Sequence, residues 1–538
     1  MKKLTLLFLI TMTISCSKKE KADTIIINAN MYTVNNNFEL AEAFAIKDGK
    51  IIDVGTTLQI QSKYASTYVN DVKGKTIIPG FIDAHCHFYG LGLQQQKVDL
   101  TGTKSFEEVL QKIIDFQKEK NVAYITGRGW DQNDWEIKEF PTKEKLDELF
   151  PNTPVSITRI DGHALLANQT AIDLAGVTIN TPFSGGEILQ KEGKLTGVFI
   201  DNPMELIEVK IPEPSKKEKI QALKDADKIC VDLGLTTVDD AGLSREIIEL
   251  IDSLQQANEL KIRIYAMVTN TPKDLDYYLT KGILKTDRLN VRSIKVYGDG
   301  ALGSRGAAMK KPYSDKHNHF GALLASPEEF MNIAKQIAAS DYQMNSHAIG
   351  DSANYLLLKT YKEVLKGKTD RRWRIEHAQI IDKEDFKYFD NILPSVQPTH
   401  ATSDMYWAED RVGAERIKGA YAYKDLLNNY GKIALGTDFP IENVSPFLTF
   451  YAAVARKDLN NYPEEGFQIE NALTREETLK GMTVWAAFSN FEENEKGSIE
   501  VGKLADFIIL DKNIMEVEEN EIPYIKAEET YINGERVK

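Results

Sequence analysis

The stretch TIIPGFIDAHCH, residues 76–87, decides how this chain folds. The run is apolar and passes through a Pro-Gly corner, so it predicts a buried strand that ends at the histidines. Because side chains alternate along a strand, His85 and His87 project to the same side, and Cys86 faces the opposite side, where it is expected to pack. Two imidazoles that converge at a strand end are suited to bind a divalent metal ion. The pair alone also fits two polar residues in a loop, so the metal-site interpretation depends on ligands at later strand ends.

Strands alternate with helices through the middle of the chain. Capping signals open helices at Ser215, Ser326 and Thr474. Strand-like runs are expected to end near eight positions: His85, Val238, Val268, Tyr297, His347, His377, His400 and Asp438. Eight such units predict an α/β fold, a (β/α)8 TIM barrel with its chemistry at the C-terminal ends of the strands.

Short strands are also expected at both ends of the chain. Residues 23–78 and 497–538 contain brief apolar or alternating runs separated by turn residues, such as the hairpin turn at Lys47-Asp48-Gly49-Lys50. We predict that these two segments form one small β-sandwich domain around the barrel region 79–496.

One segment does not follow the βα alternation. Residues from about 90 to 212 contain two amphipathic helices, near 104–118 and 142–150, and glycine-rich aromatic loops. We interpret this segment as a cap insertion that follows barrel strand one and covers the barrel mouth.

The first fifteen residues have the features of an export signal. Lys2 and Lys3 precede an apolar run that is too short to span a bilayer, and the run ends just before Cys16. The pattern resembles a bacterial lipoprotein signal, which implies cleavage before Cys16, acylation of that cysteine and a polar tether over residues 16–22. We therefore expect an exported protein that is lipid-anchored to a bacterial membrane, on its periplasmic or cell-surface side. An ordinary secretory signal with an incidental cysteine is the alternative.

Composition limits the classes of function. The chain has 538 residues, of which 42% are hydrophobic and 27% charged, as in globular proteins. A formal net charge of −14 and the lack of a basic stripe argue against a nucleic-acid partner. Only three cysteines occur, so neither a disulfide framework nor a cysteine-based zinc site is expected. Any metal must be held by histidine and oxygen ligands.

The polar residues at the predicted strand ends form a pattern when they are taken together. His347, His377, His400 and Asp438 each end a later strand-like run, after the His85 pair. Several imidazoles and one carboxylate at successive strand ends of one barrel predict a metal centre. A second H-x-H pair, His317 and His319, lies in a polar loop and is expected to be solvated.

The order of these residues resembles the metal-dependent amidohydrolase superfamily, and most closely its YtcJ-like branch, which includes N-substituted formamide deformylases. The resemblance covers essentially the whole chain after the signal. It is carried by the segments 79–85, 127–131, 161–163, 295–305, 347–351, 376–379, 436–438 and 497–506.

The resemblance implies a ligand set. The implied metal ligands are His85, His87, Lys295, His347, His377 and Asp438. His85 and His87 would bind the more buried ion, and His347 and His377 the more exposed one. Lys295 occupies the position at which many relatives carry a lysine carboxylated by CO2 that bridges two metals; an unmodified amine, or a single ion, is the alternative. Zinc suits histidine and oxygen ligands best, as one or two ions, and manganese or iron are alternatives.

The implied chemistry is hydrolysis. Metal-bound hydroxide would attack a carbonyl group, and Asp438 would carry the proton to the leaving nitrogen. We expect a hydrolase that cleaves a non-peptide carbon–nitrogen bond, an amide or an N-acyl or N-formyl group, in a small-molecule substrate. A cyclic amide or ester hydrolase on the same site, and a non-catalytic solute-binding lipoprotein, are the alternatives. Nucleic acid is not an expected partner, the membrane is reached through the lipid anchor only, and a homo-oligomer remains an option.

Four further residues are predicted to shape the substrate pocket: His163, Trp130, His400 and Arg305. For His163 and Trp130 the alternative is a structural role in the cap. His400 would hold the substrate carbonyl, and Arg305 would bind an acidic substrate group. Glu376, which precedes His377, is expected on the outer face of its strand by alternation.

Overall fold

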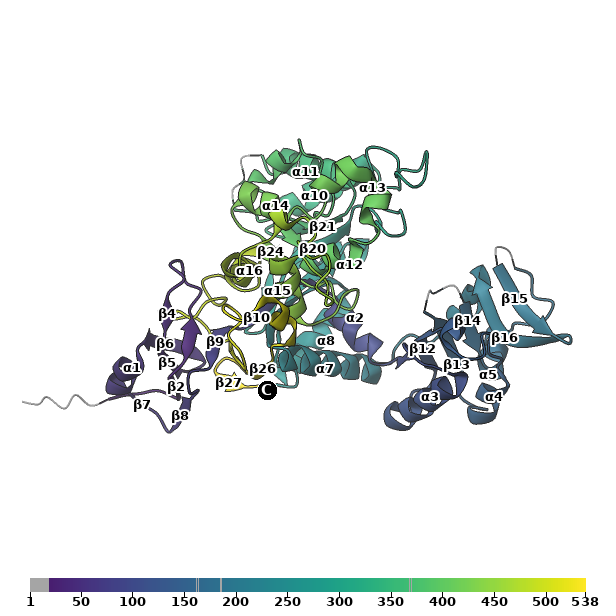
Figure 1. Ribbon diagram of the computed structural model, residues 1–538, viewed down its shortest axis with the longest axis horizontal. Coiled ribbons are helices and arrows are strands. Elements are labelled where there is room, and N and C mark those ends of the chain that lie inside the picture. The colour runs from purple at the N-terminus through teal and green to yellow at the C-terminus, as the bar shows by residue number, and fades with distance from the viewer. Residues whose placement is uncertain (1–18, 161, 163, 184–185, 367, 369) are drawn as a thin grey trace, which may run out of the picture.

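Three bodies make up the molecule (Figure 1): a β-domain, a central barrel and a lobe formed by the insertion. The computed structural model describes residues 19–160, 162, 164–183, 186–366, 368 and 370–538. The predicted signal peptide, Cys16 and His163 lie outside the described residues. In the part of the chain that is described, no helix is long and apolar enough to cross a membrane.

The central body is a barrel of eight parallel strands, as predicted. In spatial order they are β10 (Phe81–Cys86), β17 (Leu235–Leu243), β18 (Arg263–Thr269), β20 (Leu289–Tyr297), β21 (Gln343–Ala348), β22 (Arg374–His377), β23 (Leu393–Val396) and β24 (Ala434–Leu435). The short strand β19 (Leu284–Lys285) pairs with β20. Two backbone hydrogen bonds join the chain just after β24 to the end of β10: Asp438 N–His85 O at 2.8 Å and His87 N–Phe439 O at 2.7 Å.

The strand before His400 ends earlier than predicted. Strand β23 stops at Val396, and helix α12 (Pro398–Asp404) begins almost at once. Proline at the first helical position favours this start, because its fixed φ suits a helix and its missing N–H is not needed there. His400 therefore lies on a short helix and not at a strand end.

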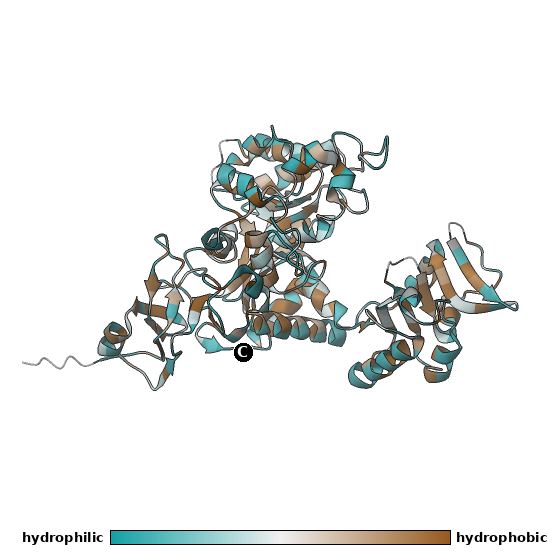
Figure 2. Ribbon diagram, viewed as in Figure 1, coloured by the Kyte–Doolittle hydropathy of each residue, from teal (hydrophilic) through white to brown (hydrophobic). Residues whose placement is uncertain are grey.

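Helices wrap the outside of the barrel. The capping boxes at Ser215, Ser326 and Thr474 are confirmed. Figure 2 shows the pattern that packing requires, since hydrophobic residues concentrate on the strands and on the inner sides of these helices. The outer helices are α7 (Lys216–Asp232), α8 (Arg245–Gln256), α9 (Pro272–Lys281), α10 (Pro327–Ala338), α11 (Asp351–Val364), α14 (Tyr423–Tyr430), α16 (Arg475–Gly481) and α17 (Val484–Ser489). Two more helices lie in the connections: α13 (Ala408–Arg416) follows α12, and α15 (Pro446–Ala455) follows β24.

The β-domain takes strands from both ends of the chain. A six-stranded sheet has the order β27 (Glu535–Arg536), β26 (Ala527–Ile532), β25 (Phe507–Leu510), β9 (Thr76–Pro79), β3 (Asn30–Tyr32) and β4 (Leu40–Ala41). A four-stranded sheet has the order β6 (Lys50–Gly55), β5 (Ala43–Lys47), β2 (Thr24–Ile27) and β8 (Tyr68–Asp71), beside the helix α1 (Thr57–Lys63) and the pair β1 (Glu20–Lys21) and β7 (Tyr64–Ala65). A buried ion pair, Arg263 Nε–Asp506 Oδ2 at 2.6 Å, ties this domain to the barrel.

The insertion forms a lobe with hydrophobic cores of its own, beside the barrel in Figure 1. Helix α2 (Phe88–Gln94) leads into it from the barrel, and α7 follows it. Its sheet has the order β11 (Val98–Asp99), β12 (Ile125–Trp130), β13 (Val155–Arg159), β14 (Ala164–Ala167), β16 (Lys194–Asp201) and β15 (Gly186–Lys191), and its helices are α3 (Phe106–Lys120), α4 (Glu144–Leu149), α5 (Gln169–Ala175) and α6 (Glu205–Glu208). Helices α3 and α4 fall where the two amphipathic patterns predict them. That the lobe caps the barrel mouth stays a prediction.

Candidate metal centre

The two histidines that end β10 are fixed through their Nδ1 atoms. His85 Nδ1 lies 2.7 Å from Glu376 Oε2, and His87 Nδ1 lies 3.0 Å from the carbonyl oxygen of Ala241. An acceptor at Nδ1 places the proton there, and this leaves the Nε2 lone pair free to bind a cation. Both Nε2 atoms face Asp438 Oδ1, at 3.6 Å from His85 and 3.2 Å from His87. Ligand atoms of these three residues all lie within 4.8 Å of one another.

Glu376 corrects an expectation from strand alternation. Its side chain is fully buried and contacts His85 inside the barrel, not the outer face of β22. Glu376 shares the inner face of β22 with Arg374, two residues before it (Nη1–Oε1 3.9 Å). His377 is the residue that departs from alternation, because His377 and Ala378 have φ values of 72° and 42° and no longer follow an extended strand. Glu376 and His377 therefore both reach the centre although they are neighbours.

A second group of potential ligands shares the same carboxylate. His377, His400 and Asp438 also offer ligand atoms within 4.8 Å of one another. His400 Nε2 lies 3.2 Å from Asp438 Oδ2, and its Nδ1 lies 2.9 Å from Glu442 Oε1. Burial lowers the pKa of His400, but the hydrogen bonds with Asp438 and Glu442 outweigh burial and raise that pKa to about 10.

His347 lies beside this group but does not join it. Its ring centroid is 4.6 Å from that of His377, yet its nitrogen atoms belong to neither cluster of ligand atoms among the described residues. His347 Nε2 instead lies 3.5 Å from Asp299 Oδ1. Burial, followed by the positive charge of Lys295, lowers the pKa of His347 to about 4.

Lys295 reaches the centre from β20. Its Nζ lies 3.0 Å from His85 Nε2, and the residue is 1% exposed. Burial lowers its pKa, which raises the fraction of neutral amine. A neutral amine is the form that can react with CO2.

The donor set fits a divalent cation. It combines imidazole nitrogens with one carboxylate, the ligands that zinc prefers when cysteine is absent. Burial raises the pKa of Asp438, but the hydrogen bond with His400 and the closeness of His87 and the other histidines outweigh burial, so the pKa lies well below its usual value and Asp438 is anionic. Asp438 Oδ1 and His347 Nε2 are buried and make no hydrogen bond within the described part of the chain. Buried polar atoms are rarely left without partners, so these two indicate a missing ligand.

Two of the residues predicted for the substrate pocket have other partners in the structure. Trp130 is fully buried in the core of the insertion, where its Nε1 donates to the Ile157 carbonyl at 3.0 Å, so it packs the lobe. The Arg305 guanidinium pairs with Asp315 (Nη2–Oδ2 2.7 Å), so it is already engaged by a carboxylate of its own loop.

A cavity of about 880 Å3 lies between the barrel and the insertion. Gly90 and Pro440, which follow His87 and Asp438 in sequence, line its barrel side. The insertion sheet contributes Thr126, Arg128 and Thr158. Arg128 donates to the Ile160 carbonyl (Nη2–O 3.0 Å) and pairs with no carboxylate among the described residues. In the segment that contains Trp130, the residues that line the cavity are Gly127, Arg128 and Gly129.

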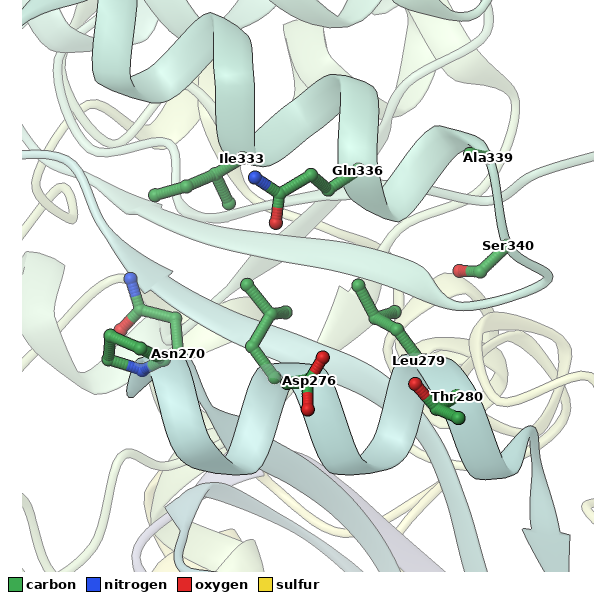
Figure 3. A pocket seen from close by; sticks show the side chains of 10 residues that line it. Asn270, Asp276, Leu279, Thr280, Ile333, Gln336, Ala339 and Ser340 are labelled. Atoms are coloured by element: carbon green, nitrogen blue, oxygen red, sulfur yellow. The ribbon is translucent and has the colours of Figure 1, made fainter.

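Another cavity lies on the outside of the barrel, between α9 and α10 (Figure 3). It measures about 560 Å3 and is lined by residues such as Asn270, Asp276 and Gln336. None of the described candidate ligands lines it, so we do not assign it to the centre.

Sequence comparison supplies the family. The model of the amidohydrolase family matches residues 69–538. The chain belongs to the amidohydrolase family. It is 33% identical to protein LONG AFTER FAR-RED 3 of Arabidopsis thaliana (91% of this chain, 88% of the relative) and 30% identical to YtcJ of Bacillus subtilis strain 168 (94% and 98%). It is 25% identical to N-substituted formamide deformylase of Arthrobacter pascens (95% and 97%).

Structure comparison agrees. A crystal structure of a metal-dependent hydrolase from Pyrococcus horikoshii OT3 matches with a TM-score of 0.77 and 29% identity, covering 92% of this chain and 99% of that one. The family and this neighbour identify the chain as an enzyme, a metal-dependent amidohydrolase that hydrolyses carbon–nitrogen bonds.

Proposed function

We propose that this amidohydrolase cleaves a non-peptide amide, as an N-acyl or N-formyl group, in a small molecule. The observation that carries the proposal is the convergence of His85, His87, His377 and His400 on the single carboxylate of Asp438. The similarity to an N-substituted formamide deformylase supports including N-formyl compounds. A cyclic amide or an ester remains the second candidate, because the same site can serve both.

A divalent cation bound here would supply Lewis acidity, which lowers the pKa of water toward neutrality and polarises a carbonyl oxygen. The chain itself supplies the proton transfers. Anionic Asp438 accepts a proton from water as the water oxygen bonds to the carbonyl carbon, and then delivers that proton to the leaving nitrogen as the carbon–nitrogen bond breaks. Glu376 holds His85, and Glu442 holds His400, in the orientation that keeps Asp438 between them.

We propose zinc, as one or two ions, with Lys295 carboxylated when two ions are bound. Nitrogen and oxygen donors without cysteine support zinc, and the buried Lys295 amine beside His85 supports carboxylation. Metal analysis of the purified enzyme tests the first point. Carbon-13 NMR after incubation with labelled bicarbonate tests the second, with a Lys295→Arg variant as the control.

The function is tested by amine release. The zinc- or manganese-loaded enzyme is assayed against a panel of N-formyl and N-acyl amines, cyclic amides and esters, with Asp438→Asn as the control. Turnover of N-acyl or N-formyl compounds that is lost in the control supports the proposal. A protein that binds metal but turns over nothing in the panel would favour the solute-binding alternative.

We also propose that the enzyme is exported and lipid-anchored through Cys16. The support is the sequence of the first 22 residues. Metabolic labelling with a fatty acid in a bacterial host tests this, because a Cys16→Ser variant should lose the label and leave the membrane fraction. Label that persists in this variant would contradict the anchor.

A further inference from the structure

We infer that Arg128 binds a carboxylate group of the substrate, in the cavity between the insertion and the barrel. The inference rests on the proposed function and narrows its substrate class to amides that carry a carboxylate away from the bond that is cleaved. It gives Arg128 the role toward an acidic substrate group that the sequence pattern suggested for Arg305, whose guanidinium already pairs with Asp315.

A polar patch lies in the insertion sheet, on strands β12 and β13. The two strands run parallel, with Thr126 opposite Ser156 and Arg128 opposite Thr158, and all four residues line the cavity. Because side chains alternate along a strand, they share one face of the sheet, whereas Ile157 packs into the hydrophobic core on the other. Figure 1 shows β12 on the side of the lobe next to α2. Three hydroxyl groups and one guanidinium thus face the cavity together.

The Arg128 guanidinium is held in place but is not neutralised. Its Nη2 donates to the Ile160 carbonyl at 3.0 Å, and it forms no ion pair within the described ranges. Gly162 leaves room for it, because a Cβ atom on that residue would lie 3.3 Å from Nη2. A guanidinium presents several N–H donors in one plane, so the donors that remain can hold a carboxylate through two parallel hydrogen bonds.

One hydroxyl of the patch has no partner of its own. Ser156 is 2% exposed, and its Oγ makes no hydrogen bond in the part of the chain that the structure describes. Buried hydroxyl groups seldom lack a partner, so this atom points to a polar ligand in the cavity. A carboxylate suits the patch, since its oxygens accept hydrogen bonds both from a guanidinium and from hydroxyl groups.

The charges around the cavity favour a ligand group with a single negative charge. Lys97 adds a second cation that forms no ion pair among the described residues, whereas Asp99 and Glu208 add carboxylates. The Asp99 Oδ1 atom accepts from the Thr101 N–H at 3.0 Å. These acids would repel a phosphate dianion more strongly than a carboxylate, because the repulsion grows with the charge of the ligand. The group that fits is therefore a carboxylate.

The barrel wall of the cavity is built from residues next to the metal centre. Gly90 packs against a candidate metal ligand, because a Cβ atom on Gly90 would lie 3.2 Å from His87 Cβ and 3.8 Å from Pro440 Cδ. Pro440, which also lines the cavity, follows Asp438 by two residues in the sequence. The substrate would place its amide at Asp438 and extend past Gly90 and Pro440 toward Arg128.

The experiment compares N-formyl amino acids of increasing chain length with neutral partners in which a carboxamide replaces the carboxylate. The zinc-loaded full chain is assayed for release of the amine. At the chain length that reaches Arg128, we expect KM to be about 10- to 100-fold lower for the carboxylate than for its neutral partner. Arg128→Gln should raise the KM of the carboxylate compound to that of the neutral one.

Two further variants separate the geometry of the side chain from its charge. Arg128→Lys keeps the charge but cannot form two parallel hydrogen bonds, so it should retain only part of the preference. Lys194→Gln, at an exposed position of the same lobe that does not line the cavity, is the matched control and should retain all of it. The inference is overturned if no chain length shows a preference for the carboxylate, or if Arg128→Gln and Lys194→Gln change the preference equally.

Binding measurements distinguish a failure of this inference from a failure of the proposed function. Calorimetry on Asp438→Asn, with and without Arg128→Gln, gives the Kd of the same compounds in the absence of turnover. A chain that binds the carboxylates through Arg128 but hydrolyses no amide supports the carboxylate site and contradicts the proposed function. An active amidohydrolase that binds carboxylates and neutral amides equally does the reverse.

Discussion

The chain carries the same three-residue pattern twice, as His85-Cys86-His87 and as His317-Asn318-His319, in two regions with different surroundings. The first pair ends β10 and points at a buried carboxylate. The second lies in the loop between β20 and α10, where His317 is exposed and His319 Nε2 contacts the carbonyl oxygen of Arg305 at 2.8 Å. Among the described residues, neither loop histidine belongs to a cluster of potential metal ligands.

The difference shows that spacing alone does not make a site. At the rim, each Nδ1 is tied to an oxygen acceptor, and the barrel brings in further ligands from strands that are distant in sequence. In the loop, the nearby acid Asp315 is neutralised by Arg305 and Arg411. The two pairs differ because the barrel strands bring other potential ligands to His85 and His87, whereas the loop brings none to His317 and His319 among the described residues.

The largest effect should come from removing one histidine of the rim pair. We expect His87→Gln to reduce the affinity for metal by more than about 100-fold, and with it the activity, because a direct ligand should matter more than the 10- to 100-fold that its hydrogen-bond partner contributes. His319→Gln is the matched loop variant and should keep both. Equal losses in metal analysis and amine release for the two variants would break the comparison.

The carboxylate at the rim should matter almost as much. Asp438→Asn should lower kcat by about 100- to 10,000-fold, since an amide cannot accept the proton of water. Asp315→Asn tests the loop carboxylate in the same assay, and we expect its kcat to stay within about twofold because Asp315 takes no part in proton transfer.

Removing the carboxylate of Glu376, which accepts from His85 Nδ1, should have an intermediate effect on metal affinity. Glu376→Gln leaves His85 without its carboxylate partner and should weaken metal binding by about 10- to 100-fold. Chelator competition measures this, and Glu384→Gln, at an exposed acid, is the control. An unchanged affinity in Glu376→Gln would mean that the barrel alone orients His85.

Protonation gives a smaller effect. The pKa of His347 is lowered to about 4 in the folded chain, below the ordinary value of 6.5, so the unfolded chain binds more protons between these values. Stability is therefore fully present above about pH 6.5 and is lost as the pH falls toward 4. On going from pH 7.5 to 5.5 the metal-free protein should lose about 1 kcal/mol through this residue. Urea unfolding should show a shallower dependence on pH in His347→Gln, and an identical dependence would refute the assignment.

The smallest effect is expected in the loop itself. His317→Gln should change the free energy of unfolding by less than about 0.5 kcal/mol, as exposed substitutions generally do. A larger change in the urea midpoint would show that the second pair has a structural role that its contacts do not reveal.

Much of this architecture could be predicted from residue patterns. Alternating elements with capping signals at Ser215, Ser326 and Thr474 defined the barrel, because local periodicity and capping are local properties. That His377 reaches the centre together with its neighbour Glu376 could not be predicted, since it depends on positive φ at His377 and Ala378, which alternation rules do not anticipate. The contact of Glu442 with His400 joins residues 42 apart and needed the fold. Pro398 was the one local signal that β23 would end before His400.

The first and last strands of the barrel meet at a seam, and the two backbone hydrogen bonds across it, from Asp438 and from His87, lie within the centre itself. A growing polypeptide thus exposes its first imidazoles some 350 residues before the carboxylate that they need has been synthesised. The chain can therefore complete its metal centre only late in its synthesis. A prematurely terminated chain would lack catalytic activity even though it contains His85 and His87.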